Sequence, residues 1–216
     1  MGALVDLTVA GGDLEPKVLG DLVVGAGFDV AAAGRNQAGA LRVRLRRARS
    51  LPDFVGPGMR LLVCGLNPSL FAADAGVPFA RRSNRFWPAA VAAGVVSVAY
   101  DPASALRRHG VGLTDLVKRA TRSADELGVE EYRAGLARVE RLCAWLRPGA
   151  VCFVGLAGWR TVIDRHATPG LQPERLGGCP LYLMPSTSGR NAHADPAVLR
   201  KHLAAASEAA VTAPPS

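Results

Sequence analysis

Three short apolar runs, separated by longer segments with helical periodicity, constrain the fold more than any other feature of this sequence. The runs are 60–66 "RLLVCGL", 150–156 "AVCFVGL" and 180–184 "PLYLM". Apolar runs of this length that are spaced by helices are typical of parallel strands buried on both faces. We therefore expect an α/β fold, a three-layer α/β/α sandwich with a central, mainly parallel sheet. The expected helices of this domain are 86–94, 130–146, 157–166 and 195–210.

The first 55 residues have a different pattern and predict a small N-terminal α/β extension. Residues 13–27 fit a short helix that ends in "GAGF". In 41–49, "LRVRLRRAR", leucine and valine alternate with arginine, which is typical of an amphipathic strand with one cationic face. Such a face could add nonspecific affinity for nucleic acid, although most faces of this kind are only solvated.

Turn-forming residues divide the chain into parts. The segment 50–58, "SLPDFVGPG", predicts the linker into the main domain. We therefore expect an N-terminal extension over 1–55, to which the sequence assigns no role. The main domain is expected over 56–208 and a disordered tail over 209–216.

Composition limits the environment and the partners. The chain has 216 residues, 49% of them hydrophobic, and it contains no apolar run long enough to span a bilayer. Its first residues lack the basic region of a signal peptide, so we expect a cytoplasmic protein with no membrane partner. A net charge of +8 favours a polyanionic partner such as nucleic acid, but a GC-rich genome would also raise the arginine content. Charge alone therefore does not identify the partner.

The cysteines and histidines do not form a metal-binding pattern. Cys64, Cys143, Cys152 and Cys179 include no C-x-x-C pair, and two of them lie inside apolar runs. The four histidines are scattered along the chain. We expect free thiols in the core, no metal and no cofactor.

Polar segments follow two of the expected strands. "NPS" (67–69) comes after the first strand and "PSTSGRNAH" (185–193) after the third. Ligands of open α/β sheets bind beyond the carboxyl ends of the strands. The carboxamide of Asn67 can hold a water through its oxygen and still donate from its nitrogen. The alternative for Asn67 is an Asn-Pro turn without chemistry.

Four motifs, taken in order, indicate a family. "GLNPS", "GVPFARRSNRFW", "GVGLTDLVKR" and "MPSTSGRNA" resemble the mismatch-specific uracil/thymine DNA glycosylases, family 2 of the uracil-DNA glycosylase superfamily. The resemblance covers roughly residues 55–205. It implies a monofunctional DNA glycosylase of base excision repair, without Schiff-base lyase chemistry, that acts as a monomer on double-stranded DNA carrying a damaged or mismatched base. The implied substrate is a flipped uracil in a G·U mismatch, with thymine, hypoxanthine, xanthine and etheno-bases as further candidates. The alternative is a noncatalytic protein that binds mismatches or abasic sites on the same scaffold.

The resemblance also implies site residues. Asn67 matches the catalytic Asn, which positions water for attack at the anomeric carbon of the sugar. Gly65, Leu66 and Ser69 would form the base pocket, with Ser69 in place of the family's Gly. Phe79 matches the aromatic residue that stacks on the extruded base, and its alternative is a core residue. In the same motif, Asn84 is expected as a cap or backbone-fixing residue, with Phe86 and Trp87 in the core.

Asp115 departs from the better-known relatives, which carry Lys or Asn at this position. Its carboxylate could activate water as a second catalytic group or accept the N3–H of the base, and we expect it to broaden the substrate range. The alternative is an Asp that caps a helix after Thr114.

The last motif matches the loop that enters the duplex. Ser186, Thr187 and Ser188 would contact the phosphates that flank the target. Gly189 would allow close approach, and Arg190, followed by Asn191, stands where relatives insert a wedge into the hole left by the flipped nucleotide. The alternative is a turn that leads into the last helix.

Overall fold

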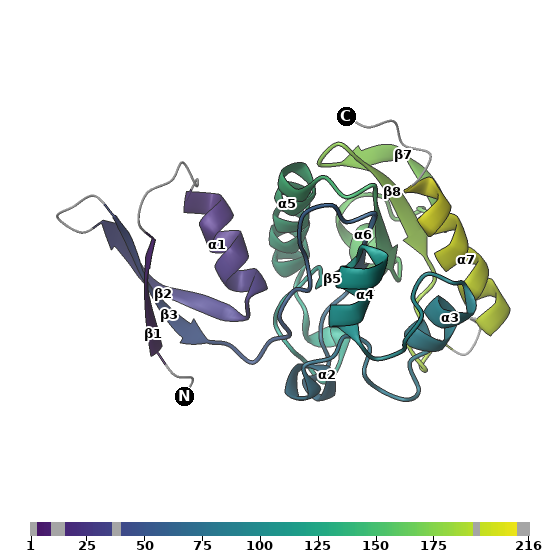
Figure 1. Ribbon diagram of the computed structural model, residues 1–216, viewed down its shortest axis with the longest axis horizontal. Coiled ribbons are helices and arrows are strands. Elements are labelled where there is room, and N and C mark those ends of the chain that lie inside the picture. Colours follow the sequence, from purple (N-terminus) through teal and green to yellow (C-terminus); the bar gives the residue numbers. More distant parts are fainter. Residues whose placement is uncertain (1–3, 10–15, 36–39, 192–194, 211–216) are drawn as a thin grey trace.

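The computed structural model describes residues 4–9, 16–35, 40–191 and 195–210. Figure 1 shows two parts: a small N-terminal sheet with one helix, and a larger part in which helices surround a second sheet. No helix among the described residues is both long and apolar enough to cross a membrane.

The larger sheet has the strand order β5-β4-β6-β8-β7. β5, β4, β6 and β8 run parallel, and only β7 is antiparallel to its neighbour. Every residue of β4, β5 and β6 is buried, as in a parallel sheet that is covered on both faces. The strands are β4 (Leu61–Gly65), β5 (Val111–Asp115), β6 (Ala150–Val154), β7 (Gly170–Leu176) and β8 (Cys179–Met184).

Helices cover both faces of this sheet and complete the three layers. Alternate residues of β4 enter different cores. Leu61 and Val63 belong to the core that includes residues of α3 and α7, whereas Leu62 and Cys64 belong to the core that includes residues of α5 and α6. The helices are α2 (Leu70–Ala75), α3 (Phe86–Ala92), α4 (Pro102–His109), α5 (Val129–Leu146), α6 (Ala157–Val162) and α7 (Pro196–Ala209), with a 3₁₀ turn at Ala124–Glu126. The expected α/β/α sandwich is confirmed.

The N-terminal extension is a three-stranded antiparallel sheet with the order β1-β3-β2. Leu19 and Val23 of the helix pack on Val43 and Leu45 of the central strand, as the alternating pattern predicts. On the opposite face the expected row of arginines is partly neutralised, because Arg44 is paired with an aspartate of β1. The elements are β1 (Leu4–Val9), α1 (Pro16–Gly25), β2 (Phe28–Arg35) and β3 (Leu41–Arg47).

Several details of the prediction change in the structure. The sequence pattern did not reveal β1, β2, β5 or β7. The expected tail begins at a residue that still belongs to α7, and its residues 211–216 lie outside the described part of the chain, as do residues 13–15 of the first expected helix. The four cysteines are free and buried, as predicted.

Candidate functional site

A cavity of about 710 Å³ opens at the carboxyl ends of β4, β5, β6 and β8. Its walls come from the turn after β4, the loop before α3, the end of β5 and the loop after β8. All of the site residues predicted from the sequence line it except Gly65, which lies behind Asp115 and Phe79. The predicted residues in the wall are Leu66, Asn67, Ser69, Phe79, Asp115, Ser186, Thr187, Ser188, Gly189, Arg190 and Asn191.

The side chain of Asn67 is held by its nitrogen. Nδ2 donates to Thr121 Oγ1 at 2.7 Å and to the main-chain oxygen of Arg119 at 3.1 Å. It also lies 3.3 Å from the main-chain oxygen of Pro68. Carbonyl oxygens only accept, so these partners fix which end of the amide faces them. The carboxamide oxygen is thereby left on the other side, where it can accept a hydrogen bond from water.

Thr121 is a site residue that the sequence analysis missed. Its side chain is 3% exposed, and Oγ1 donates to the main-chain oxygen of Ser123 at 2.8 Å. Since that hydroxyl hydrogen is used, Oγ1 faces Asn67 as an acceptor. The Thr121 main chain also pairs with the Asn-Pro turn, through Thr121 N to Pro68 O (3.1 Å) and Leu70 N to Thr121 O (3.2 Å). Thr121 therefore fixes both the backbone and the amide of the candidate catalytic turn.

Ser69 closes this turn and begins the next helix. Its Oγ accepts a hydrogen bond from Ala72 N at 3.1 Å, which caps α2. Ser69 also lines the cavity, so this residue contributes both to the cap of α2 and to the cavity wall.

Asp115 ends β5 directly opposite Gly65, which ends β4. A Cβ atom on Gly65 would lie 2.5 Å from Asp115 Oδ1 and 3.3 Å from Phe79 Cζ. The glycine therefore makes room for both side chains. Asp115 does not begin a helix, so the interpretation of this residue as a helix cap is wrong.

Phe79 has an unusual backbone for an aromatic residue, with φ of 55°. Bulky residues rarely adopt this left-handed region, and such strain is common in binding sites. The ring stacks on Phe86 with centroids 4.3 Å apart, and the neighbouring Pro78 oxygen accepts a hydrogen bond from Trp87 Nε1 at 2.7 Å. Phe86 and Trp87 are fully buried, and Asn84 Oδ1 accepts from Phe86 N, as expected for the start of α3. Phe79 is thus a half-buried ring that a rigid support holds at the cavity wall.

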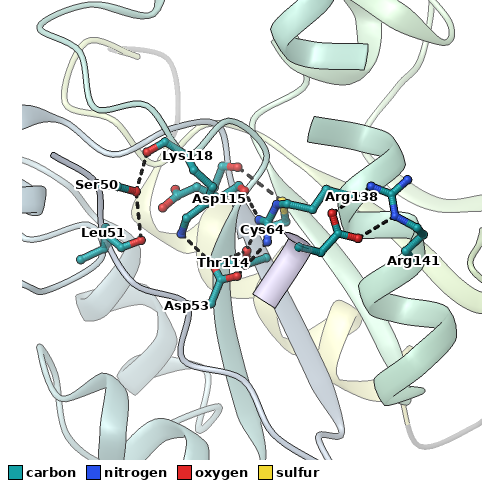
Figure 2. Close-up of polar contacts among 11 residues, drawn as sticks. Ser50, Leu51, Asp53, Cys64, Thr114, Asp115, Lys118, Arg138 and Arg141 are labelled. Atoms are coloured by element: carbon teal, nitrogen blue, oxygen red, sulfur yellow. Dashed lines mark hydrogen bonds and ion pairs between the residues drawn. The ribbon is translucent and has the colours of Figure 1, made fainter. Parts of the chain in front are cut away.

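The environment of Asp115 is buried and charged. The pKa of this carboxyl is raised from 3.8 to about 6: burial is the largest cause, the negative charge of Asp53 adds to the increase, and the positive charges of Lys118 and Arg138 oppose it. Figure 2 shows these groups next to one another. Near neutral pH the carboxyl is therefore mostly ionised, with its titration close to the working range of a catalytic group.

Residues 186–191 form a compact loop in which each hydroxyl of the two serines supports the turn. Ser186 Oγ accepts from Ser188 N, and Ser188 Oγ accepts from Arg190 N, both at 3.3 Å. Arg85, which directly precedes α3, anchors the loop: its main-chain N–H donates to Thr187 O at 2.9 Å and its guanidinium donates to Ser188 O at 3.2 Å. The loop is therefore presented in a defined shape at the rim of the cavity.

Three members of this loop are held by the protein itself. Thr187 is 1% exposed, so its hydroxyl does not face solvent as a phosphate contact would. Gly189 makes its close approach to Ser83, whose main-chain oxygen would lie 2.9 Å from an added Cβ. Arg190 reaches across the cavity, and its Nη1 donates to Ser123 Oγ at 3.3 Å.

Residues 52–208, well over half of the chain, match the sequence model of the Uracil DNA glycosylase superfamily. The sandwich fold and the cavity at the carboxyl edge of its sheet agree with this assignment, and the chain belongs to that superfamily. Membership supports a DNA glycosylase role in base excision repair, with DNA as the partner.

Proposed function

We propose that the protein is a monofunctional, mismatch-specific DNA glycosylase that hydrolyses the N-glycosidic bond of a flipped uracil in a G·U pair and leaves an abasic site. The observation that carries the proposal is the fixed carboxamide of Asn67, whose nitrogen is bound by Thr121 and by main-chain oxygens at the cavity wall. Because the nitrogen is bound and Asn67 lines the cavity, its carboxamide oxygen is left to hold a water.

The chemistry follows from this arrangement. Asn67 Oδ1 holds a water for attack at the anomeric carbon as the bond to the base breaks. An amide is a weak base, so the bond must break largely before the water attacks. Phe79 supplies a stacking surface for the flipped base, a contact worth about 1–3 kcal/mol per base in nucleic-acid complexes.

Asp115 acts as the second catalytic group in this proposal. Its pKa of about 6 leaves it mostly ionised at neutral pH, because burial raises the value only part of the way to neutrality. The carboxylate can accept a proton from the attacking water or stabilise positive charge on the sugar. Through contact with different bases it would also extend the range to thymine, hypoxanthine, xanthine and etheno-bases.

Lys118 bears on the absence of lyase chemistry, because it lies within one of the four family motifs. Schiff-base formation needs an accessible amine. The Nζ of Lys118 lies 2.6 Å from Asp53 Oδ1, its side chain is 7% exposed, and the residue does not line the cavity. This burial supports hydrolysis without strand cleavage.

The rim of the cavity suits a DNA backbone. Arg81, Arg122 and Arg190 all line it, and arginine is a common partner of phosphate oxygens. In this proposal a monomer in the cytoplasm binds the duplex here, and Arg190 leaves Ser123 to fill the space of the flipped nucleotide.

The test is single-turnover cleavage of labelled duplexes that contain G·U, G·T, A·U or hypoxanthine pairs, with alkali to reveal abasic sites. Wild type, Asn67→Ala and Asp115→Ala are compared, with Gln172→Ala as a control that removes an amide of β7 outside the cavity lining. We expect abasic sites with wild type, their loss with Asn67→Ala and a change of substrate profile with Asp115→Ala. Tight binding to mismatches without cleavage by wild type would instead establish a noncatalytic binding protein. Equal activity of Asp115→Ala and wild type on every lesion would remove Asp115 from the mechanism.

A further inference from the structure

A buried group of charges lies beneath the cavity and has no part in the proposed chemistry. Asp53 is at its centre, with a side chain that is only 5% exposed. Its Oδ1 accepts from Lys118 Nζ at 2.6 Å and from Thr114 Oγ1 at 2.7 Å, and its Oδ2 lies 2.8 Å from Arg138 Nη1. Figure 2 shows these side chains converging on one carboxylate.

These contacts join three distant segments of the chain. Asp53 lies in the segment before β4, Lys118 in the loop after β5 and Arg138 in the middle of α5. Ser50, from the same segment as Asp53, donates from Oγ to the main-chain oxygen of Lys118 at 2.6 Å. Residues 50–53 are therefore built into the main domain, although their sequence predicts a linker.

The same group of charges contacts Asp115 through its backbone. Arg138 Nη2 donates to the main-chain oxygen of Asp115 and to Thr114 Oγ1, both at 2.9 Å. Arg138 is 5% exposed, so this guanidinium is committed to the end of β5. A displacement of Arg138 would therefore move the backbone that carries Asp115.

The charges that act on Asp115 come from three segments of the chain. Lys118 follows it on the same loop, Arg138 comes from α5, and Asp53 comes from the segment before β4. The thiol of Cys64 lies on the neighbouring strand, where burial raises its pKa, so it stays neutral. Asp53 carries one negative charge against the two positive charges of Lys118 and Arg138, and it is the only acid among these neighbours.

We propose that Asp53 is a positioning residue that holds Lys118 and Arg138 beneath the cavity and, by balancing their charge, sets the pH at which Asp115 ionises. Without Asp53 the two cations would be less balanced, and an ionised Asp115 would become more favourable. Without Lys118 one positive charge would be lost, and an ionised Asp115 would become less favourable. Only the consequence for reaction rate rests on the proposed function.

The experiment follows the Asp115 carboxyl by ¹³C NMR during a pH titration, with its resonance assigned by comparison with Asp115→Asn. The variants are Asp53→Asn, Lys118→Met and the double variant, with Asp74→Asn as a control that removes an aspartate from an exposed ion pair with Arg49. We expect the midpoint to fall by about 1 pH unit in Asp53→Asn and to rise by a similar amount in Lys118→Met. It should return to within about half a unit of wild type in the double variant, and Asp74→Asn should leave it unchanged.

If the midpoint shifts in opposite directions in the two single variants and the shifts cancel in the double variant, charge balance is the cause. Structural damage would instead shift the midpoint in the same direction in both single variants. If Asp53→Asn does not fold, the comparison of Lys118→Met with the double variant still tests the proposal, because the second change must reverse the first. A midpoint unchanged by these substitutions, or shifts of the same sign, would overturn it. The NMR result does not depend on glycosylase activity, so the proposed function can fail while this inference holds. In an active enzyme the limb of the pH–rate profile that depends on Asp115 should move in the same directions.

Discussion

Gly65 and Asp115 end two neighbouring parallel strands directly opposite each other, and no side chain on Gly65 fits beside the carboxylate. An added Cβ would lie 2.5 Å from Asp115 Oδ1, a separation that Cβ atoms essentially never show. The ring of Phe79 lies on the same side, at 3.3 Å from that position. The glycine is therefore required by close packing of two candidate site residues and not by its backbone angles.

Gly65→Ala should consequently reduce both activity and stability. The methyl group would push Asp115 or Phe79 from its place, and a misplacement of about 1 Å can cost about 100-fold in rate. The cost in the free energy of unfolding should be about 1–3 kcal/mol, as for other overpacked sites. Single-turnover rates and urea denaturation measure the two effects. Gly20→Ala is the control, because nothing lies within 4 Å of the Cβ that it adds on α1 and alanine favours a helix. Full activity of Gly65→Ala would contradict the packing argument.

Thr121→Val tests whether the orientation of Asn67 matters for the reaction. Valine keeps the size of threonine but removes the acceptor that lies 2.7 Å from Asn67 Nδ2. The amide would lose its shortest contact, and we expect the single-turnover rate to fall by roughly 10- to 100-fold. Thr161→Val removes an exposed hydroxyl of α6 that donates to Ala157 O, and it should leave the rate unchanged. Equal rates for Thr121→Val and wild type would show that Asn67 does not need this support.

Phe79→Ala should weaken capture of the flipped base. The loss of one stacking surface of about 1–3 kcal/mol corresponds to a roughly 5- to 150-fold lower rate at subsaturating enzyme. Trp145→Ala, which removes an exposed aromatic residue of α5, serves as the control. A base analogue that fluoresces when it is unstacked reports the effect directly. If its signal on binding is the same for Phe79→Ala and wild type, Phe79 only supports the core.

Within the larger sheet, the sequence predicted the strands that are apolar throughout. β4, β6 and β8 were recognisable because a strand buried on both faces needs a continuous apolar run. β5 was not, since "VGLTD" contains a glycine and two polar residues. Its polar end is buried only because Asp53 and Arg138 supply partners for Thr114, and those partners lie far away in the sequence.

The same distinction applies to the site. Asn67, Phe79 and Asp115 were found because each lies in a short motif whose order along the chain is informative. The role of Thr121 depends on how the chain after β5 pairs with the turn after β4. That of Asp53 depends on where residues 50–53 dock against α5. No local pattern encodes either contact, so both required the structure.

Asp115→Asn should stabilise the protein in a pH-dependent way. The folded-state pKa of about 6 lies above the 3.8 of the unfolded chain, because burial disfavours the charged form. The stability contributed by this group is therefore complete below pH 3.8 and is lost as the pH rises through 6. Asparagine does not titrate, so its gain in free energy of unfolding over wild type should grow by about 2 kcal/mol from pH 4.5 to 7.5.

The stability that Asp53 contributes should depend on pH in the opposite direction. Burial alone would raise the pKa of Asp53, but the charges of Lys118 and Arg138 hold it below its usual value. Its contribution is therefore present at neutral pH and lost on acidification, and Asp53→Asn removes it. Urea denaturation of wild type and Asp115→Asn at pH 4.5 and 7.5 measures the first difference. For Asp53→Asn the comparison with wild type is made at pH 7.5 and at a pH below 3.8, because the contribution of Asp53 is lost only below that value. A gain for Asp115→Asn that did not change with pH would show that Asp115 is not held in a buried, charge-disfavouring site.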